Sequence, residues 1–271
     1  MILRKKSEKE SNSTGRGLAV GFFFAFYPQK LLCLLFSVYL CGMIMKNIRH
    51  IIIIGLCTLT STMQAQHVSY RSFAHYNKRV AQFEREGGIT SQSIVMLGNS
   101  LTENGKDWSQ RLGNSHVINR GIIGDNTVGM TERLCQITSH QPRAIFLMAG
   151  INNMVNNTPV INVAQQVISL IEAIREQTPQ TKLFVESLLP INEKNGRWRT
   201  LAGRTNDIPL TNMYIRAYCE SHDIAFIDLF SKMVKPGTNV LREELSADGL
   251  HITEAGYAIW ENELKKHLAN L

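Results

Sequence analysis

The chain has 271 residues, of which 44% are hydrophobic and 19% charged, a composition that suits a globular protein with one large domain or two small ones. Its formal net charge is +7, but residues 1–65 hold eight of the 29 Lys and Arg and only two of the 22 Asp and Glu. Residues 66–271 are therefore close to neutral, which gives no support to nucleic-acid binding by the folded part, and we expect no nucleic-acid partner.

Residues 45–65 have the three parts of a secretory signal peptide. Lys46 and Arg49 give a short positive start, Ile51–Leu59 is an apolar run, and Ala65 ends a stretch of small and polar residues. The apolar run is too short for a comfortable membrane span. We therefore expect cleavage near Ala65, export to the periplasm or the extracellular space, and a mature domain covering residues 66–271.

Residues 1–44 allow two interpretations. The stretches 18–27 and 31–45 are apolar and flank a polar break, so they could form a membrane segment that tethers the protein. Alternatively, translation begins at Met45, because a complete signal peptide starts there. We favour the second interpretation, and we expect a membrane partner only if residues 1–44 are retained.

Along the rest of the chain, apolar runs alternate with segments of helical periodicity. In chain order the pattern predicts a helix at 72–86, a strand at 93–97, a short helix at 107–112, a strand at 116–119, a helix at 127–138, a strand at 143–148, a helix at 159–177, a strand at 182–188, a helix at 209–222, a strand at 225–229 and a helix at 253–268. This alternation predicts an α/β fold, a three-layer α/β/α sandwich around a five-stranded parallel sheet.

Two features of this domain leave alternatives open. The polar stretch 192–208 has no periodicity and is either a substrate-facing loop or a mobile surface loop. Cys135 and Cys219 fall in predicted helices, where two buried thiols are favoured over a disulfide. The spacing of Cys and His residues indicates no metal site.

The first predicted strand runs directly into a Gly-Asn-Ser turn that ends at Ser100. Open α/β sheets bind their ligands at the carboxyl ends of the strands, so we expect Ser100 to be a nucleophile there. Asp248 and His251 stand three residues apart before the last helix, a spacing that lets Asp248 orient the imidazole while the other ring nitrogen acts as the base for Ser100. Each fragment alone also suits ordinary turn and helix-capping chemistry.

Acyl transfer also needs hydrogen-bond donors for the oxyanion that forms during the reaction. Gly121 and Asn152 each follow a predicted buried strand. A glycine lets a backbone N–H approach a ligand closely, and an Asn side chain donates without adding charge. Both residues fall at the sheet edge where Ser100 is expected, so the sequence predicts a complete esterase site.

Four ordered blocks of residues resemble the motif blocks of the SGNH (GDSL-type) hydrolase superfamily. The blocks are Gly98-Asn99-Ser100-Leu101, Gly121, Gly150-Ile151-Asn152-Asn153 and Asp248-Gly249-Leu250-His251. They occur in the family's order, and the resemblance spans about residues 93–268. It implies a flavodoxin-like fold with neither a metal nor an organic cofactor.

The resemblance also implies a role for each motif residue. Ser100 would be the nucleophile, His251 the base, and Asp248 the acid that orients it. The N–H groups of Ser100 and Gly121 and the side chain of Asn152 would form the oxyanion hole. The implied enzyme is a carboxylic ester hydrolase that acts on a small-molecule or glycan ester.

Two positions depart from the family pattern, because Asn99 and Asn153 stand where the family usually has Asp. Neither belongs to the triad, and both can still make turn hydrogen bonds, so we expect activity to survive. The stretch 119–126 resembles the branch of platelet-activating-factor acetylhydrolase-like and sialate or other carbohydrate O-acetylesterases. It predicts removal of acetyl groups from carbohydrates; the alternatives are a lysophospholipase or thioesterase for longer acyl chains and a non-catalytic glycan-binding module.

Overall fold

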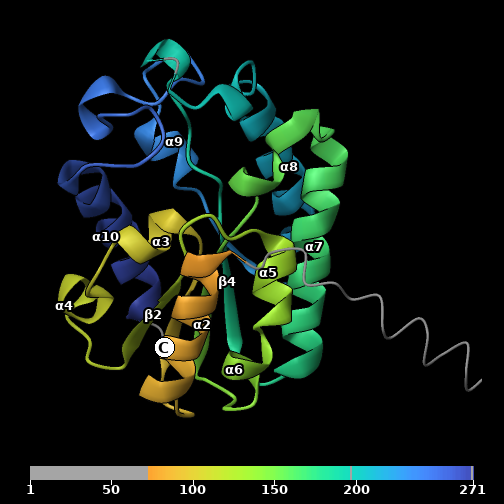
Figure 1. Cartoon of the computed structure of the whole chain (residues 1–271), viewed down its shortest axis with the longest axis vertical. Helices are drawn as coiled ribbons and strands as arrows, with labels where there is room; N and C mark the ends of the chain where they lie inside the picture. Colours follow the sequence, from red (N-terminus) through yellow and green to blue (C-terminus); the bar gives the residue numbers. More distant parts are fainter. Residues whose placement is uncertain (1–72, 196, 270) are drawn as a thin grey trace, which may run out of the picture. The chain divides into compact units, whose positions relative to one another are not determined.

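The computed structural model describes residues 73–195, 197–269 and 271 (Figure 1). The predicted signal peptide, its cleavage point at Ala65 and the segment 1–44 lie outside the described residues. Within the described part of the chain, no helix has the length and apolar character needed to cross a membrane. In the same residues, no group of three or more His, Cys, Asp or Glu is placed to hold a metal ion.

A five-stranded parallel sheet forms the centre of the domain, in the order β2-β1-β3-β4-β5. The strands are β1 (Ile94–Gly98), β2 (Val117–Gly121), β3 (Ala144–Met148), β4 (Lys182–Glu186) and β5 (Ala225–Ile227). This is the strand order of flavodoxin-like folds, which bind ligands at the carboxyl ends of β1 and β3, where the winding direction reverses. The predicted α/β fold with five parallel strands is confirmed.

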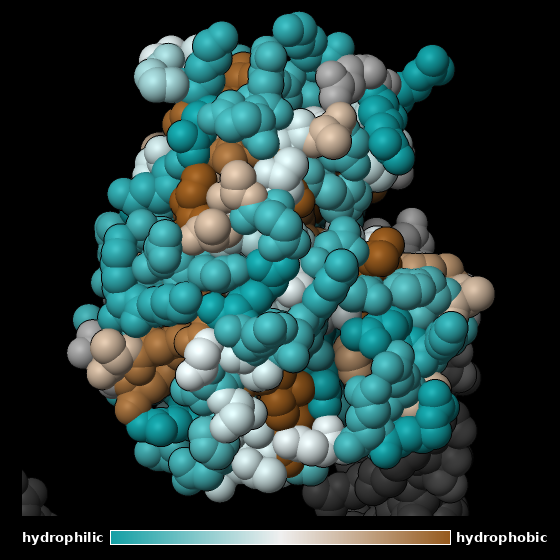
Figure 2. Space-filling view, turned by 90° about the vertical axis from the view of Figure 1, so that its left-hand side faces the viewer, coloured by the Kyte–Doolittle hydropathy of each residue, from teal (hydrophilic) through white to brown (hydrophobic). Residues whose placement is uncertain are grey.

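Helices cover both faces of the sheet (Figure 1). One face carries α5 (Thr127–Glu132), α6 (Cys135–Thr138), α7 (Val160–Gln177) and α8 (Asp207–Ser221), and the other carries α4 (Trp108–Leu112), α9 (Phe230–Met233) and α10 (Glu254–Leu268). The side of the molecule with α4 and α10 is mostly hydrophilic at its surface (Figure 2). A further helix, α2 (Ala74–Glu86), packs its own small apolar cluster against Ile122, just after β2.

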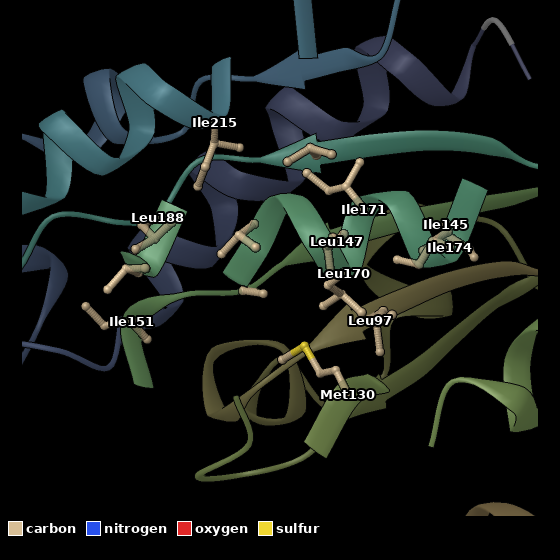
Figure 3. Close-up of a cluster of buried hydrophobic side chains, with 14 of the residues drawn as sticks. Leu97, Met130, Ile145, Leu147, Ile151, Leu170, Ile171, Ile174, Leu188 and Ile215 are labelled. Atoms are coloured by element: carbon tan, nitrogen blue, oxygen red, sulfur yellow. The ribbon is translucent and has the colours of Figure 1, made fainter. Parts of the chain in front are cut away.

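The sheet is buried on both faces because its strands are continuous apolar runs. Successive side chains of a strand point to opposite faces, so Val95 and Leu97 of β1 join one core while Ile94 and Met96 join the other. Figure 3 shows Leu97 beside side chains of α7 such as Leu170. The 3.6-residue spacing of apolar residues in α7 thus produces the stripe that covers β1 and β3.

Three details of the elements differ from the sequence prediction. The predicted helix 127–138 is two helices, because Arg133 leaves helical geometry and turns its guanidinium into the domain. A five-residue helix, α3 (Ser100–Asn104), follows β1 and is too short to show periodicity in sequence. The stretch 192–208 contains two short 3₁₀ turns, at Glu193–Asn195 and Arg199–Leu201.

The two cysteines of the domain are both free thiols, as the sequence favours, but only one is buried. Cys219 lies in the core, where burial raises the pKa of its thiol to about 12. Cys135 is exposed, and the prediction that it is buried is wrong. On the short helix α6, Leu134 and Ile137 take the inward positions, which leaves Cys135 on the solvent side.

Glu186, the last residue of β4, is a carboxyl group buried in the domain, with 2% of its surface exposed. Burial raises its pKa to about 8, because an ionised carboxylate loses its hydration there. The nearby indole N–H of Trp260 opposes this shift only weakly, since the two groups do not reach ordinary hydrogen-bond geometry. Glu186 is therefore protonated in the folded protein at neutral pH.

We expect Glu186 to make folding stability fall as pH rises. Between its usual pKa of 4.5 and the folded value of about 8, the folded state holds a proton that the unfolded state releases. The stabilisation is fully present below pH 4.5 and is lost as pH approaches 8. Thermal denaturation at pH 5 and pH 8.5 should show a smaller difference in Tm for Glu186→Gln than for the wild type. The exposed Glu220→Gln is the control, and an equal difference in all three proteins contradicts this expectation.

Candidate active site

Ser100 is the first residue of α3, directly after the carboxyl end of β1. The turn is fixed by Asn99, whose side-chain Oδ1 accepts the N–H of Leu101 at 2.9 Å as a helix cap. The N–H of a first helical residue has no acceptor within its helix, so the Ser100 amide points out of the helix end beside its own hydroxyl. One residue thus presents both a hydroxyl and a hydrogen-bond donor at the expected edge of the sheet.

The structure brings the predicted serine, histidine and aspartate together. Nε2 of His251 lies 3.0 Å from Oγ of Ser100, and Nδ1 of His251 lies 2.8 Å from Oδ2 of Asp248. The turn that carries the last two is held by Gly249, whose φ of +86° favours glycine. A Cβ there would meet the carbonyl oxygen of Asn192, so only glycine fits this turn.

The electrostatics of the Asp248 carboxyl group favour its ionised form. Burial raises its pKa, but hydrogen bonds from the His251 side chain and from the N–H groups of Leu250 and His251 outweigh burial and lower the pKa to about 2. An ionised carboxylate only accepts hydrogen bonds, so Nδ1 of His251 carries the proton. In the neutral imidazole, the lone pair of Nε2 then faces the Ser100 hydroxyl, as a general base requires.

Asn152 lies in a 3₁₀ turn, Ile151–Asn153, that follows β3. Its Nδ2 donates one hydrogen bond to the carbonyl oxygen of Asp125 at 2.7 Å. An amide nitrogen carries two hydrogens, so this bond fixes the side chain and leaves a second donor for a ligand. The predicted role of Asn152 as an oxyanion donor is compatible with this arrangement.

Gly121 does not have the free N–H that the sequence predicts for an oxyanion donor. Its N–H donates to the side-chain oxygen of Asn119 at 2.8 Å, and the amide of Asn119 in turn donates to carbonyl oxygens of Thr102, Glu103 and Lys106. A Cβ at Gly121 would lie 2.2 Å from the backbone nitrogen of Glu103. Gly121 is therefore required for close packing of β2 against α3, and its amide is already in use.

Two asparagines stand where the family usually has aspartates. For Asn153, the hydrogen bonds explain why an amide suits this position. Its Nδ2 donates to Oγ1 of Thr127 at 2.7 Å and to Oε1 of Gln166 at 2.8 Å, and a carboxylate could not donate to the amide oxygen of Gln166. Its Oδ1 also accepts the N–H of Thr127 at 3.3 Å. Asn99 differs, because its Nδ2 is buried without a hydrogen-bond partner in the described part of the chain.

A buried ion pair that the sequence does not reveal supports this site. Arg133 and Asp125 are 1% and 0% exposed, and Nε of Arg133 lies 2.9 Å from Oδ2 of Asp125. Nη2 of Arg133 also donates to the carbonyl oxygen of Gly98, two residues before Ser100. Since the backbone carbonyl of Asp125 holds Asn152, this ion pair links the end of β1 to the predicted oxyanion donor.

A second link comes from Glu103, three residues after Ser100 on α3. Its carboxylate accepts the N–H of Ile123 at 2.5 Å, binds Nε2 of His75 at 3.0 Å and forms an ion pair with Arg79 at 3.2 Å. Both of these partners, His75 and Arg79, lie on α2. Glu103 therefore anchors the loop after β2 to α2 and to the helix that begins with Ser100.

The aromatic ring of Trp198, from the polar stretch that follows β4, contacts the base. Its ring centroid lies 5.2 Å from that of His251, with the planes at 73° in an edge-to-face contact. The prediction that the stretch 192–208 faces the site is consistent with this contact. Trp198 itself could not be assigned from sequence, because its segment has no periodicity.

Comparison with known proteins identifies the family of this chain. Residues 96–259 match the model of the GDSL-like lipase/acylhydrolase family. The chain belongs to this family. The match covers more than half of the chain and includes the Ser100, Asn152 and His251 segments. Membership makes the protein an ester hydrolase of the acylhydrolase type.

Relatives and solved structures agree with this assignment. Subunit alpha2 of platelet-activating factor acetylhydrolase IB from Rattus norvegicus is 25% identical over 170 residues, covering 61% of this chain and 71% of the relative. A GDSL-like lipase from Bacteroides thetaiotaomicron superposes with a TM-score of 0.63 at 22% identity, covering 70% of this chain and 97% of its own. A lipase/acylhydrolase from Enterococcus faecalis gives a TM-score of 0.53 at 22% identity, over 66% and 96% of the two chains.

We expect removal of Arg133 to destabilise this GDSL-family domain strongly. Arg133→Met removes the guanidinium that pairs with the buried Asp125 carboxylate, and breaking a buried ion pair in this way typically costs about 3–5 kcal/mol. The double variant with Asp125→Asn should recover part of the loss, because the buried negative charge is also removed. Urea unfolding followed by circular dichroism measures both. Arg216→Met breaks the half-exposed pair with Asp228 and should cost less than about 1 kcal/mol; a similar cost for both arginines contradicts the expectation.

Proposed function

We propose that the protein is a serine esterase that removes short acyl groups, acetyl above all, from carbohydrates through an acyl-Ser100 intermediate. The observation that carries this proposal is the continuous chain of hydrogen bonds from Asp248 through His251 to the Ser100 hydroxyl, at 2.8 and 3.0 Å. These distances are those of a nucleophile, its base and the group that orients the base. A non-catalytic glycan-binding module has no need of this arrangement.

In the proposed first step, Oγ of Ser100 attacks the ester carbonyl carbon while its proton passes to Nε2 of His251. Asp248 stabilises the imidazolium that forms. The oxyanion would be met by the N–H of Ser100 and by the second Nδ2 hydrogen of Asn152, and each such donor is typically worth ~10²–10³ in rate. His251 then gives its proton to the leaving alcohol, and water activated by His251 releases the acid from Ser100.

Acetyl is supported as the acyl group by the relatives, which are named as acetylhydrolases. A carbohydrate is supported as the alcohol by the aromatic ring of Trp198 beside His251 and by the polar stretch around it. Export through the signal peptide at residues 45–65 would bring the enzyme to acetylated glycans outside the cytoplasm. We propose no nucleic-acid partner, and a membrane partner only if residues 1–44 are retained.

A second candidate is an acylhydrolase for longer chains, and one feature of the surface favours it. A groove of about 960 Å³ lies between α5 and α7, beginning at Thr127 and bordered by Val128, which is 40% exposed. Thr127 forms hydrogen bonds with Asn153, the residue after Asn152, so one end of the groove lies near the candidate active site. A long acyl chain could lie along it, as apolar ligands do in grooves of this size.

Replacement of the nucleophile tests the serine mechanism. Ser100→Ala should lower hydrolysis of p-nitrophenyl acetate by roughly 10⁴-fold or more, because the acyl-enzyme cannot form. The substitution removes one hydroxyl, so the thermal unfolding curve should stay close to that of the wild type. Ser221→Ala, at the exposed end of α8, is the matched control and should retain full activity. Turnover by Ser100→Ala at the wild-type rate would falsify the proposal.

A chain-length series separates the two candidate functions. With p-nitrophenyl esters from acetate to palmitate, kcat/KM should be highest for acetate and should fall as the acyl chain lengthens. Val128→Asp, which places a charge in the α5–α7 groove, should leave acetate hydrolysis unaffected. A preference for chains of about eight carbons or more, lost in Val128→Asp, would instead assign the longer-chain activity.

A further inference from the structure

The helix α2 contacts the helix of the nucleophile through the side chain of Glu103. The Glu103 carboxylate lies 3.0 Å from Nε2 of His75 and 3.2 Å from Nε of Arg79. His75 and Arg79 are four positions apart on α2, a spacing that puts both on one face of the helix. α2 therefore presents two basic side chains to one acidic side chain on α3, beside which it lies (Figure 1).

The same carboxylate also holds the loop after β2. Its Oε2 accepts the N–H of Ile123 at 2.5 Å. Two residues further along the loop, the carbonyl oxygen of Asp125 accepts the Nδ2 hydrogen of Asn152 at 2.7 Å. This loop is thus bonded to the nucleophile's helix at one point and to the proposed oxyanion donor at the next. The position of the Glu103 carboxylate therefore affects the spacing between the N–H of Ser100 and Nδ2 of Asn152.

Neither α3 nor the loop is rigid by its own local structure. α3 has five residues, and so short a helix depends on contacts with the rest of the domain. In the loop, Gly124 has a φ of +79°, a conformation that favours glycine. Phe73, directly before α2, packs here, since a Cβ on Gly124 would lie 3.2 Å from its ring. The start of α2 therefore supports both the loop and, through Glu103, the helix.

The contact between α2 and Glu103 is largely shielded from water. The side chains of Arg79 and Glu103 are 17% and 15% exposed, and charged groups attract each other more strongly when water is partly excluded. Loss of His75 and Arg79 would leave the carboxylate without two of the three partners described above. α2 ends at Glu86, before residues 96–259 that match the family model, so membership of the family assigns this helix no role.

We propose that His75, Arg79 and Glu103 are positioning residues through which α2 sets the spacing of the two oxyanion donors. The proposal rests on the proposed function, in which the Ser100 N–H and Asn152 meet the oxyanion, and it adds α2 to the active-site apparatus. The three side chains do not take part in the chemistry themselves. Hydrogen bonds to the oxyanion form in the transition state, so a changed spacing lowers kcat and leaves KM nearly unchanged.

The test measures kcat and KM for p-nitrophenyl acetate. Glu103→Ala should lower kcat by about 30-fold and leave KM within about twofold of the wild type. Glu103→Gln keeps an acceptor for the Ile123 N–H and should lose only about fivefold, as should Arg79→Gln. Arg79→Gln added to Glu103→Ala should lower kcat no further, because Arg79 acts through the carboxylate.

A second readout reports on the oxyanion donors directly. Phenyl trifluoromethyl ketone can add to Ser100 to form a hemiketal whose oxyanion takes the place of the one in the reaction. A transition-state analogue should lose affinity in step with the rate. Its Ki should therefore rise in each variant by about the factor by which kcat falls, whereas an unchanged Ki contradicts the positioning role.

Glu84→Ala is the matched control. Glu84 is also a glutamate of α2 with a hydrogen bond to the rest of the domain, in this case from Nε2 of Gln136 at 3.1 Å. This variant should retain the wild-type kcat. An equal loss in Glu84→Ala, a kcat of Glu103→Ala within threefold of the wild type, a loss confined to KM, or fully additive effects of Arg79 and Glu103 overturns the proposal.

Circular dichroism checks that each variant is folded at the assay temperature. If Glu103→Ala does not fold, Glu103→Gln and Arg79→Gln decide the question, and an unchanged kcat in both overturns the proposal. The failure of the proposed function is a separate result, because hydrolysis would then be unaffected by Ser100→Ala. Hydrolysis that depends on Ser100 but not on Glu103 overturns the role of α2 and leaves the esterase.

Discussion

The buried ion pair between Asp125 and Arg133 is the interaction on which the site depends. Two charges removed from water need complete pairing, and here the carbonyl oxygen of Gly98 and the N–H of Asn126 complete it. The pair joins the end of β1, the loop after β2 and, through the Asp125 carbonyl, Asn152. The nucleophile and the proposed oxyanion donor are thus fixed from inside the domain, without help from exposed loops.

The sequence predicts the elements of the sheet to within a few residues, because buried parallel strands are continuous apolar runs and α7 has a clear helical period. It also predicts that Ser100 meets His251 and Asp248, since Ser100 follows a strand and the other two precede the last helix. It could not show that the Gly121 amide is taken by Asn119, because the state of an N–H depends on tertiary contacts. The sequence also could not show that Arg133 leaves helical geometry and points into the domain, because residues 127–138 look like one regular helix.

The catalytic triad and the polar stretch after β4 come from different parts of the fold. Ser100 follows β1, and Asp248 and His251 share the turn before α10. The stretch after β4 contains short 3₁₀ turns, and its Trp198 contacts His251. Loops on a rigid scaffold can vary while the reacting groups keep their geometry, which is how one fold serves many functions.

The positions of Asp248, His251 and Ser100 along the chain have a consequence for how the triad is assembled. The acid and the base lie on one turn, whereas the hydrogen bond from His251 to Ser100 joins residues 151 positions apart. A growing chain that has completed all five strands still lacks both partners of its serine. The triad is therefore complete only when the segment before α10 has folded onto the finished sheet.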